Sequence, residues 1–473
     1  MSQLEECKLK NIKNPLAVLE ERLNSAAQFC SAYIKKYDEI KLWEIFGGVQ
    51  RSVGIQIEKG YLKESASGTT SALTIRLFGE HGNVGSASIK DLSNPSAKRA
   101  IEKAKSTMKV SLPNPEFKGL VKPPNKYPDI QTEWDRDIEN LTIDDTTDVI
   151  DRFLQEPARD KRIKSISGGL SYSDGRIIII NSNGIDLTDK TTSASIAIGY
   201  TMEEIINGKK ENSSAYDGQE FIYFKEIHNV IDKLFDETYK KAERGIRKHK
   251  IETGKFPAVL SPRAVDVLIT TPICSAIDAE KVYHNRSFLQ YYLNQKIGVD
   301  FLTINDDPWL KGGLLTSPFD VEGTPTKPIS IIKNGVLKSF LHNNYTANLF
   351  DTESTGHASR GWYSPSIGIS SSNILLNTGD YTKEEMISEI QKGVYFDITY
   401  DHANLVTGEF SGMVSSGFLI EEGEIKNALR ETMFGINLID FFKKIKGFSK
   451  NRVRKESSYL PFALISDISF SGQ

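Results

Sequence analysis

Five prolines fall within the seventeen residues from Leu112 to Pro128 (LPNPEFKGLVKPPNKYP). Proline fixes φ and has no backbone N–H, so this density forbids a helix interior and disfavours a central strand. We therefore predict a linker over residues 112–130. Because 473 residues exceed what one hydrophobic core usually supports, two or three domains are expected, and the linker marks the first boundary between them.

The segments on either side of the linker, residues 1–111 and 131–252, repeat one pattern of elements. In the first, a helix capped by Asn14 and Pro15 precedes strands at 53–58 and 71–77 and a helix near 95–108. In the second, a helix near 144–154 precedes strands at 163–172, 176–181 and 191–200 and a helix at 224–248. The apolar residues of the first helix recur at steps of three and four: Leu16, Leu19, Leu23, Ala27 and Cys30.

A short internal repeat supports this duplication, since residues 69–75 read TTSALTI and residues 191–198 read TTSASIAI. From residue 253 to 473 the texture changes to strands punctuated by glycine, with a hairpin turn at Asn334-Gly335 and helices near 383–393 and 437–446. The sequence therefore predicts an α+β fold. A duplicated α/β N-terminal half, in which a helix packs on an antiparallel sheet twice, precedes a β-rich C-terminal domain.

The composition argues against several classes of function. Lys and Arg total 59 against 62 Asp and Glu, a net charge of -3, so a nucleic-acid partner is not expected. The three cysteines show no metal-ligand or CxxC spacing, and Cys274 is predicted to be a buried, inert thiol. Charged residues interrupt every apolar run at the N-terminus, and no segment approaches the ~20 apolar residues of a membrane span. We expect a cytoplasmic protein without a membrane partner.

Few residues have the sequence spacing of a known catalytic or metal-binding motif. No two of the seven histidines lie within five residues, so an HExxH-type zinc helix is absent from the sequence. A β-rich domain can still bring distant loops together, and the sequence allows a site built from His342, His357, Asp401 and His402. The carboxylate pairs Asp306-Asp307 and Asp320/Glu322 stand next to turn residues, where we expect them to cap backbone amides rather than to act in catalysis.

Several motifs resemble, in their order along the chain, those of the PmbA/TldD family of peptidases. They are Leu315–Thr326 (LTSPFDVEGTPT), 331–337 (IIKNGVL), Ser354–Ala358 (STGHA), Gly408–Ser411 (GEFS), Gly417–Glu424 (GFLIEEGE) and Ile468–Gly472 (ISFSG), with Ile180–Gly184 (INSNG) upstream. The resemblance covers about residues 162–473. It implies the duplicated N-terminal half, the β-rich C-terminal domain and pairing with a related subunit across a large interface.

This family contains two kinds of subunit. The TldD-like kind carries His-Glu-x-x-x-His on a helix of the C-terminal domain and a cysteine near Gly-Glu-Phe, which together bind zinc and activate a water molecule. In the matching helix of this chain, which begins at Ser261, the two histidine positions fall on Thr270 and Ser275 and the glutamate position on Thr271. The cysteine position falls on Val414. The resemblance therefore implies no catalytic residue and no metal in this chain, with zinc expected in a partner.

The remaining motifs resemble the PmbA/TldE-like kind of subunit, which lacks the zinc motif. The resemblance implies a non-catalytic subunit of a heteromeric metallopeptidase, paired with a TldD-like zinc-bearing subunit and acting on unfolded or short peptides. An extended peptide would add to a strand edge by backbone hydrogen bonds. The residues expected to bind it are His357, Gly408, Glu409, Phe410 and Ser411.

Two other hypotheses stay open at this point. The chain could be a stand-alone hydrolase that uses a non-zinc site built from residues such as His357, His402 and Glu409. It could also be a regulatory or binding homodimer without a protease partner.

Overall fold

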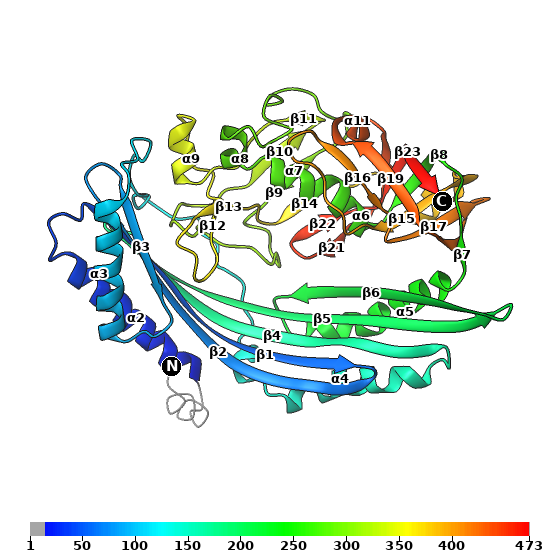
Figure 1. Cartoon of the computed structure of the whole chain (residues 1–473), viewed down its shortest axis with the longest axis horizontal. Coiled ribbons are helices and arrows are strands. Elements are labelled where there is room, and N and C mark those ends of the chain that lie inside the picture. The colour runs from blue at the N-terminus through cyan, green and yellow to red at the C-terminus, as the bar shows by residue number, and fades with distance from the viewer. Residues whose placement is uncertain (1–14, 473) are drawn as a thin grey trace.

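The computed structural model describes residues 15–472, so the predicted cap Asn14 and the thiol of Cys7 lie outside the described residues. The N-terminal half forms one antiparallel sheet of six strands in the order β3-β2-β1-β4-β5-β6 (Figure 1). Its elements run in the order α2 (Pro15–Ile34), β1 (Leu42–Glu58), β2 (Tyr61–Phe78), β3 (Val84–Ile89), α3 (Asn94–Val110), η1 (Asp137–Asn140), η2 (Asp144–Thr146), α4 (Thr147–Gln155), η3 (Glu156–Ala158), β4 (Ile163–Asn181), β5 (Asp186–Ile206), β6 (Lys209–Phe221) and α5 (Glu226–Gly245).

The predicted duplication is visible in this order, because a helix, three strands and a helix occur twice. The two segments of the internal repeat lie in β2 and β5, which pair with β1 and β4 respectively. β1 and β4 in turn pair along most of their length, from Glu44↔Asn181 to Ile57↔Gly168. The two units therefore share one continuous sheet instead of forming two separate sheets.

The strands are longer than the sequence pattern indicated. Residues 163–172 and 176–181, predicted as two strands, form the single strand β4, and the strand predicted at 71–77 extends over Tyr61–Phe78 as β2, with Gly68 inside it. The reason is the pairing on both sides: Gly175 sits opposite Gln50 of β1 and Thr191 of β5, so its backbone stays within the ladder. Cross-strand hydrogen bonds override the turn preference of glycine here.

Two pairs of helices cover one face of the sheet, one pair on each half. α2 and α3 pack on the half around β1, β2 and β3, burying the predicted apolar residues of the first helix with side chains such as Ile45 and Ile75. α4 and α5 cover the other half, where Phe153 and Phe235 meet edge to face over Ile196 and Ile198. No helix or strand is found between α3 and η1, the region that contains the proline-rich segment.

The C-terminal domain contains two main sheets, and together with the N-terminal units it confirms the predicted α+β fold. The larger sheet comprises β7 (Lys248–His249), β8 (Gly254–Leu260), β15 (Lys392–Ile398), β16 (Glu409–Met413), β17 (Ser416–Glu421), β18 (Glu424–Leu429), β19 (Thr432–Asn437), β20 (Ile445–Phe448) and β23 (Ala463–Gly472). The smaller comprises β9 (Ile304–Asp306), β10 (Ile329–Lys333), β11 (Val336–Leu337), β14 (Ile374–Leu376), β21 (Val453–Lys455) and β22 (Ser458–Leu460), and β12 (Ala358–Ser359) pairs with β13 (Gly368–Ile369).

The helices of this domain are short. They are α6 (Pro262–Val265), the π-helical turn η4 (Asp266–Thr270), α7 (Thr271–Ala276), α8 (Ala279–Tyr283), α9 (Asn344–Leu349), α10 (Lys383–Ser388) and α11 (Leu438–Phe442). The predicted helices at 383–393 and 437–446 were thus too long, because strands β15 and β20 begin at Lys392 and Ile445. The predicted hairpin turn is confirmed: Asn334 and Gly335 both have positive φ, 52° and 74°, between β10 and β11.

The C-terminal domain lies over the face of the N-terminal sheet that the helices leave open (Figure 1). At one end, the buried guanidinium of Arg360 pairs with Glu44, and the ring of Trp362 lies so close to Gly48 that a Cβ there would be 2.0 Å from it. At the other end, Lys455 forms an ion pair of 2.9 Å with Asp217 of β6. The two contacts fix the domain across the sheet.

Candidate functional site

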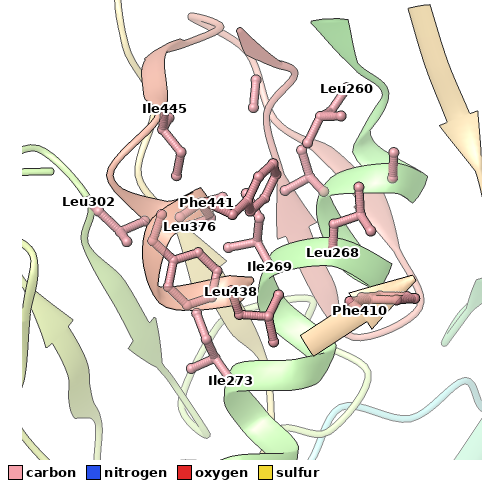
Figure 2. Packing of buried hydrophobic residues seen from close by; sticks show 14 of the residues in the cluster. Leu260, Leu268, Ile269, Ile273, Leu302, Leu376, Phe410, Leu438, Phe441 and Ile445 are labelled. Carbon is pink, nitrogen blue, oxygen red and sulfur yellow. The ribbon is translucent and has the colours of Figure 1, made fainter. Parts of the chain in front are cut away.

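The helical segment on which the resemblance places the zinc motif lies in the core of the C-terminal domain. Its first turn is capped by Ser261, whose Oγ accepts a hydrogen bond of 3.2 Å from the Ala264 N–H. The backbone N–H of Thr271 then donates to the Asp266 carbonyl, five residues back. This π turn comes directly before Pro272, which has no N–H to continue the ladder. Figure 2 shows Leu268 and Ile269 of this segment beside Phe410 and Leu438 in the core.

Thr270, Thr271 and Ser275 lie on the opposite side of this segment. All three line a cavity of about 260 Å³ together with Cys274 and Lys281. The Thr270 hydroxyl donates a hydrogen bond of 2.5 Å to the Asp266 carboxylate, and the ammonium group of Lys281 donates to the Ser275 carbonyl at 3.2 Å. The three positions assigned from the resemblance therefore share one wall. Burial raises the pKa of Cys274 to about 12, which keeps this thiol protonated and unreactive.

Val414, the fourth position assigned from the resemblance, does not lie on this cavity wall with Thr270, Thr271 and Ser275. Its side chain is 6 % exposed and packs in the same core as Leu268, and its backbone N–H donates to the Thr432 carbonyl at 2.8 Å. It is absent from the wall of the cavity that contains Thr270.

This cavity is one end of a longer space, which we call the sheet cleft. A second cavity of about 360 Å³ shares Asp266 and Glu456 with the first. A third, of about 470 Å³, shares Ser195, Ala197 and Tyr216 with the second. The sheet cleft thus runs from Thr270 along the underside of the C-terminal domain onto the open face of the N-terminal sheet.

Small side chains form the floor of the sheet cleft. Where the third cavity crosses the strands, the lining includes Gly54, Ala66, Gly168, Gly169 and Ala197. Adjacent hydroxyls pair across the strands, with Ser171 and Ser195 oxygens 2.8 Å apart. A floor of this kind leaves room above the backbone and offers few side chains that would select one sequence.

The roof of the sheet cleft carries charge of both signs. Burial raises the pKa of Asp266, the Thr270 hydrogen bond opposes this rise, and the nearby Glu456 adds to it. Arg263 lines the same space and donates to the Tyr216 carbonyl at 3.0 Å. Charged groups of both signs on the roof therefore face a floor whose own charged residues are acidic, namely Glu64 in the third cavity and Asp217 and Glu220 in the second.

Strand β16 carries the residues predicted to bind a peptide. It lies at one edge of the large sheet, with Phe410 buried in the core and Glu409 and Ser411 exposed. The preceding loop occupies much of this edge: the Asn404 N–H donates to the Glu409 carbonyl at 2.8 Å, and the Met413 N–H donates to Asp401 at 2.7 Å. A peptide strand could pair here only around Ser411 unless this loop moved.

Gly408 begins this edge with a φ of +73°, and a Cβ added there would lie 3.2 Å from the Phe288 ring. Gly408 therefore makes the tight turn that leads into β16, since glycine adopts this backbone conformation without strain.

His357 lies apart from both places. Its side chain is buried, with Nδ1 2.9 Å from the Thr355 carbonyl and Nε2 3.2 Å from Asp306. Asp306 accepts a further hydrogen bond of 2.7 Å from the Ser372 N–H. His357 thus joins β12 to β9 inside the domain, and it lines none of the three cavities of the sheet cleft.

The alternative site from His342, His357, Asp401 and His402 is not assembled. Within residues 15–472, no three His, Cys, Asp or Glu side chains are arranged so that they could hold a metal ion. His342 packs edge to face on Phe350, and burial lowers its pKa. His402, in contrast, is exposed.

The carboxylate pairs cap backbone amides, as predicted. Asp307 accepts from the Trp309 N–H at 2.9 Å. Asp320 accepts from the N–H groups of Glu322, Thr324 and Ala358 at 2.9, 3.0 and 3.0 Å. It therefore closes its own turn and attaches that turn to β12.

Glu322 has an unusual environment, from which a pH dependence follows. Burial and then the neighbouring Asp320 raise its pKa to about 8. The folded state therefore binds this proton more tightly than the unfolded state, and the free energy of unfolding should fall as pH rises from about 4.5 to 8.

We expect Glu322→Gln to remove this loss, because glutamine can still accept from the Asn344 N–H, now 2.8 Å from Glu322. At pH 8.5 the variant should be more stable than the native chain by ~2 kcal/mol or more, and near pH 5 the two should be similar, as thermal unfolding across pH would measure. Glu353→Gln, at a side chain 93 % exposed, is the control. Parallel pH profiles for native chain and Glu322→Gln would contradict the assignment.

Sequence reasoning missed the π turn, the Asp266/Glu456 pair and the floor of the cleft. The signal for the first was present in Thr271-Pro272, since a proline within a helical pattern predicts a break there. The floor could not be read from sequence, because it combines strands of the two N-terminal units, which are distant along the chain.

Comparison with known protein families shows where this architecture recurs. Models described as the PmbA/TldA metallopeptidase domain 1, central domain and C-terminal domain match residues 43–107, 136–246 and 253–472. The chain belongs to the PmbA/TldD family. The three matches follow the two N-terminal units and the β-rich domain in order.

Individual relatives agree with this assignment. The chain is 26 % identical over 471 residues to metalloprotease PmbA of Escherichia coli O157:H7, covering 96 % of each. It is 26 % identical over 411 residues to a metalloprotease of Methanocaldococcus jannaschii, covering 84 % of this chain and 87 % of that one. These names support a peptidase at the level of the family.

Solved structures share the fold. TldE from Thermococcus kodakarensis superposes with a TM-score of 0.82 at 20 % identity, covering 94 % of this chain and 100 % of that one. A protein of Bacteroides thetaiotaomicron described as a modulator of DNA gyrase gives 0.84 at 22 % identity, covering 95 % and 99 %. In the part of the chain that the structure describes, no helix has both the length and the apolar character needed to cross a membrane.

Proposed function

We propose that this chain is a non-catalytic, metal-free subunit of a PmbA/TldD-type metallopeptidase. In this proposal a TldD-like partner supplies the zinc, and this chain completes the cleft that holds the peptide. The family assignment supports the peptidase context. The rest depends on the side chains that this chain has at the positions of the zinc motif.

The observation that carries the proposal is the wall formed by Thr270, Thr271 and Ser275. Zinc is bound by thiolate, imidazole and carboxylate groups, and these three side chains offer only neutral hydroxyls. The Thr270 hydroxyl is moreover engaged with Asp266 at 2.5 Å. Val414, at the position of the expected cysteine, has an apolar side chain within the core.

The sheet cleft supports a substrate class of unfolded or short peptides. Its three cavities measure about 260, 360 and 470 Å³. The first is lined by the C-terminal domain and the third by the N-terminal sheet, and the second, which shares residues with both, lies between sheet and domain. A space of this size accommodates an extended chain but not a folded domain. The floor of glycine, alanine and serine side chains suits peptides of varied sequence, and we prefer this cleft to the β16 edge, which a loop largely occupies.

Activity measurements with and without a partner test the proposal. The purified chain should hydrolyse a casein-derived peptide mixture no faster than buffer and should contain less than one tightly bound zinc per ~10 chains by elemental analysis. Adding a TldD-like subunit with an intact His-Glu-x-x-x-His motif should raise the rate at least ~100-fold above this chain alone, a difference of ~2.7 kcal/mol in activation free energy.

A partner whose motif glutamate is changed to glutamine is the control, and it should form the complex without activity. Peptidase activity of this chain alone, lost on His402→Ala or Glu409→Ala, would overturn the proposal in favour of a stand-alone hydrolase. Purification from the native cell that recovers only copies of this chain would favour the homodimer instead. The expected cytoplasmic location stays a prediction.

A further inference from the structure

A second, larger cavity lies on the other side of the contact between the two halves of the chain. It measures about 670 Å³ and is enclosed by α5, by the loop before α10, by the loop after β20 and by one face of the large C-terminal sheet. Asp217, Arg263 and Lys455 line both this cavity and the sheet cleft, so they form the partition between them.

Positive charge dominates its lining. Nine Lys and Arg residues face four Asp and Glu residues, a surplus of five positive charges in a protein whose net charge is -3. The cations come from four separate parts of the chain. Those without an ion pair among the described residues are Lys240, Arg244, Lys383, Lys450 and Arg452.

Two of the four carboxylates, Asp217 and Asp397, are engaged by cations of the partition. Lys241 lies 3.1 Å from Asp217 and 3.3 Å from Asp397, Arg263 pairs with both acids, and Lys455 pairs with Asp217. Burial disfavours the charge of Asp217, but these three cations together hold its pKa below the usual range. The two acids therefore offset two of these three cations, and the cavity as a whole keeps its surplus of five positive charges.

Lys383 shows that the uncompensated charge is partly withdrawn from water. Its ammonium group lies 5.2 Å from the Tyr395 ring centre and 5.3 Å from that of Phe462. Burial lowers its pKa; the nearby Glu384 and Glu237 oppose this shift, and Arg244 and Lys241 add to it. A cation placed like this is stabilised by an anion that enters the cavity, since Coulomb attraction is stronger where water is excluded.

We propose that this cavity binds a small molecule with clustered phosphate groups, either a nucleoside polyphosphate or an inorganic polyphosphate. Several cations from different elements can contact one such group, and Lys and Arg are the usual ligands of phosphate oxygens. The volume lies within the range of small-molecule pockets. The aromatic side chains in the wall, among them Tyr381 and Phe418, could contact a base if one is present.

Calorimetric titration of this chain alone, with tripolyphosphate and separately with ATP, tests the proposal. We expect one site per chain with Kd below ~100 µM at ~0.1 M salt, weakening as salt is raised. Equal affinity for the two ligands would assign recognition to the phosphates. At least ~10-fold tighter binding of ATP, about 1.4 kcal/mol, would assign the aromatic wall a part in it.

Lys240→Glu with Lys450→Glu should weaken binding at least ~10-fold, because both exposed side chains face the cavity and each lost phosphate contact is worth ~1.5 kcal/mol or more. Lys161→Glu with Lys164→Glu makes the same change of charge at exposed positions outside the cavity and should leave binding unchanged. Absence of saturable binding up to ~2 mM of either ligand, or equal weakening in both double variants, would overturn the proposal. Neither outcome depends on a protease partner.

Discussion

Ser195→Trp is expected to lower kcat/KM of the assembled peptidase at least ~10-fold, a loss of ~1.4 kcal/mol or more in transition-state stabilisation. Ser195 lies on β5 where the second and third cavities of the sheet cleft meet, and it is partly exposed there. A tryptophan side chain covers roughly 150–250 Å² of surface and would fill this junction. The loss should appear with peptide substrates once the zinc-bearing partner is present.

Thr201→Trp is the matched control. Thr201 lies on the same strand and the same face, is exposed where Ser195 is partly exposed, and pairs its hydroxyl with Ser214 at 3.2 Å as Ser195 does with Ser171. It lines none of the three cavities. An equal loss of kcat/KM in both variants would indicate a general effect on the sheet. Full activity of Ser195→Trp would contradict the assignment of the peptide-binding site to the sheet cleft. An inactive native assembly would instead contradict the proposed function itself.

The order of elements could be predicted from sequence because it depends on local patterns. The helical spacing from Leu16 to Cys30, the turn at Asn334-Gly335 and the repeat at 69–75 and 191–198 each reflect a preference of a few neighbouring residues. Their outcome in the structure agrees with those preferences. The lengths of the strands were underestimated, because glycines such as Gly68 and Gly175 are held in place by partners more than ten residues away.

The candidate site likewise contains some positions that a local sequence pattern could predict and others that it could not. Thr270, Thr271 and Ser275 share a wall because they lie at helical spacing on one segment, so a local motif was enough to bring them together. Val414 and His357 were placed by motif position alone; Val414, directly after β16, packs in the core, and His357, directly before β12, is buried beside Asp306. The joint between the halves of the chain, at Asp217 and Lys455, has no local signature at all.

In the floor of the sheet cleft, the backbones of neighbouring strands of the shared sheet approach one another closely, which no sequence pattern indicates. Gly168 and Gly169 lie side by side on β4, between β1 and β5, with φ values of +135° and +143°. A Cβ on Gly168 would lie 2.1 Å from the Ala197 carbonyl oxygen, and one on Gly169 would lie 1.9 Å from that of Ile55. The backbone of β4 thus approaches both neighbouring strands more closely than any side chain would permit, and the floor there is bare backbone.

Gly169→Ala should therefore destabilise the protein by ~3 kcal/mol or more, since it combines a backbone conformation that alanine avoids with a clash against main-chain atoms. Differential scanning calorimetry should show the melting temperature falling by roughly 3 °C or more. Gly54→Ala, on the adjacent strand β1 and also in the cleft floor, is the control, because a Cβ there meets nothing within 4 Å. It should change stability by no more than ~0.5 kcal/mol. If Gly169→Ala and Gly54→Ala had the same melting temperature, the close approach of β4 to its neighbours would not be a requirement of the fold, and the bare floor would need another explanation.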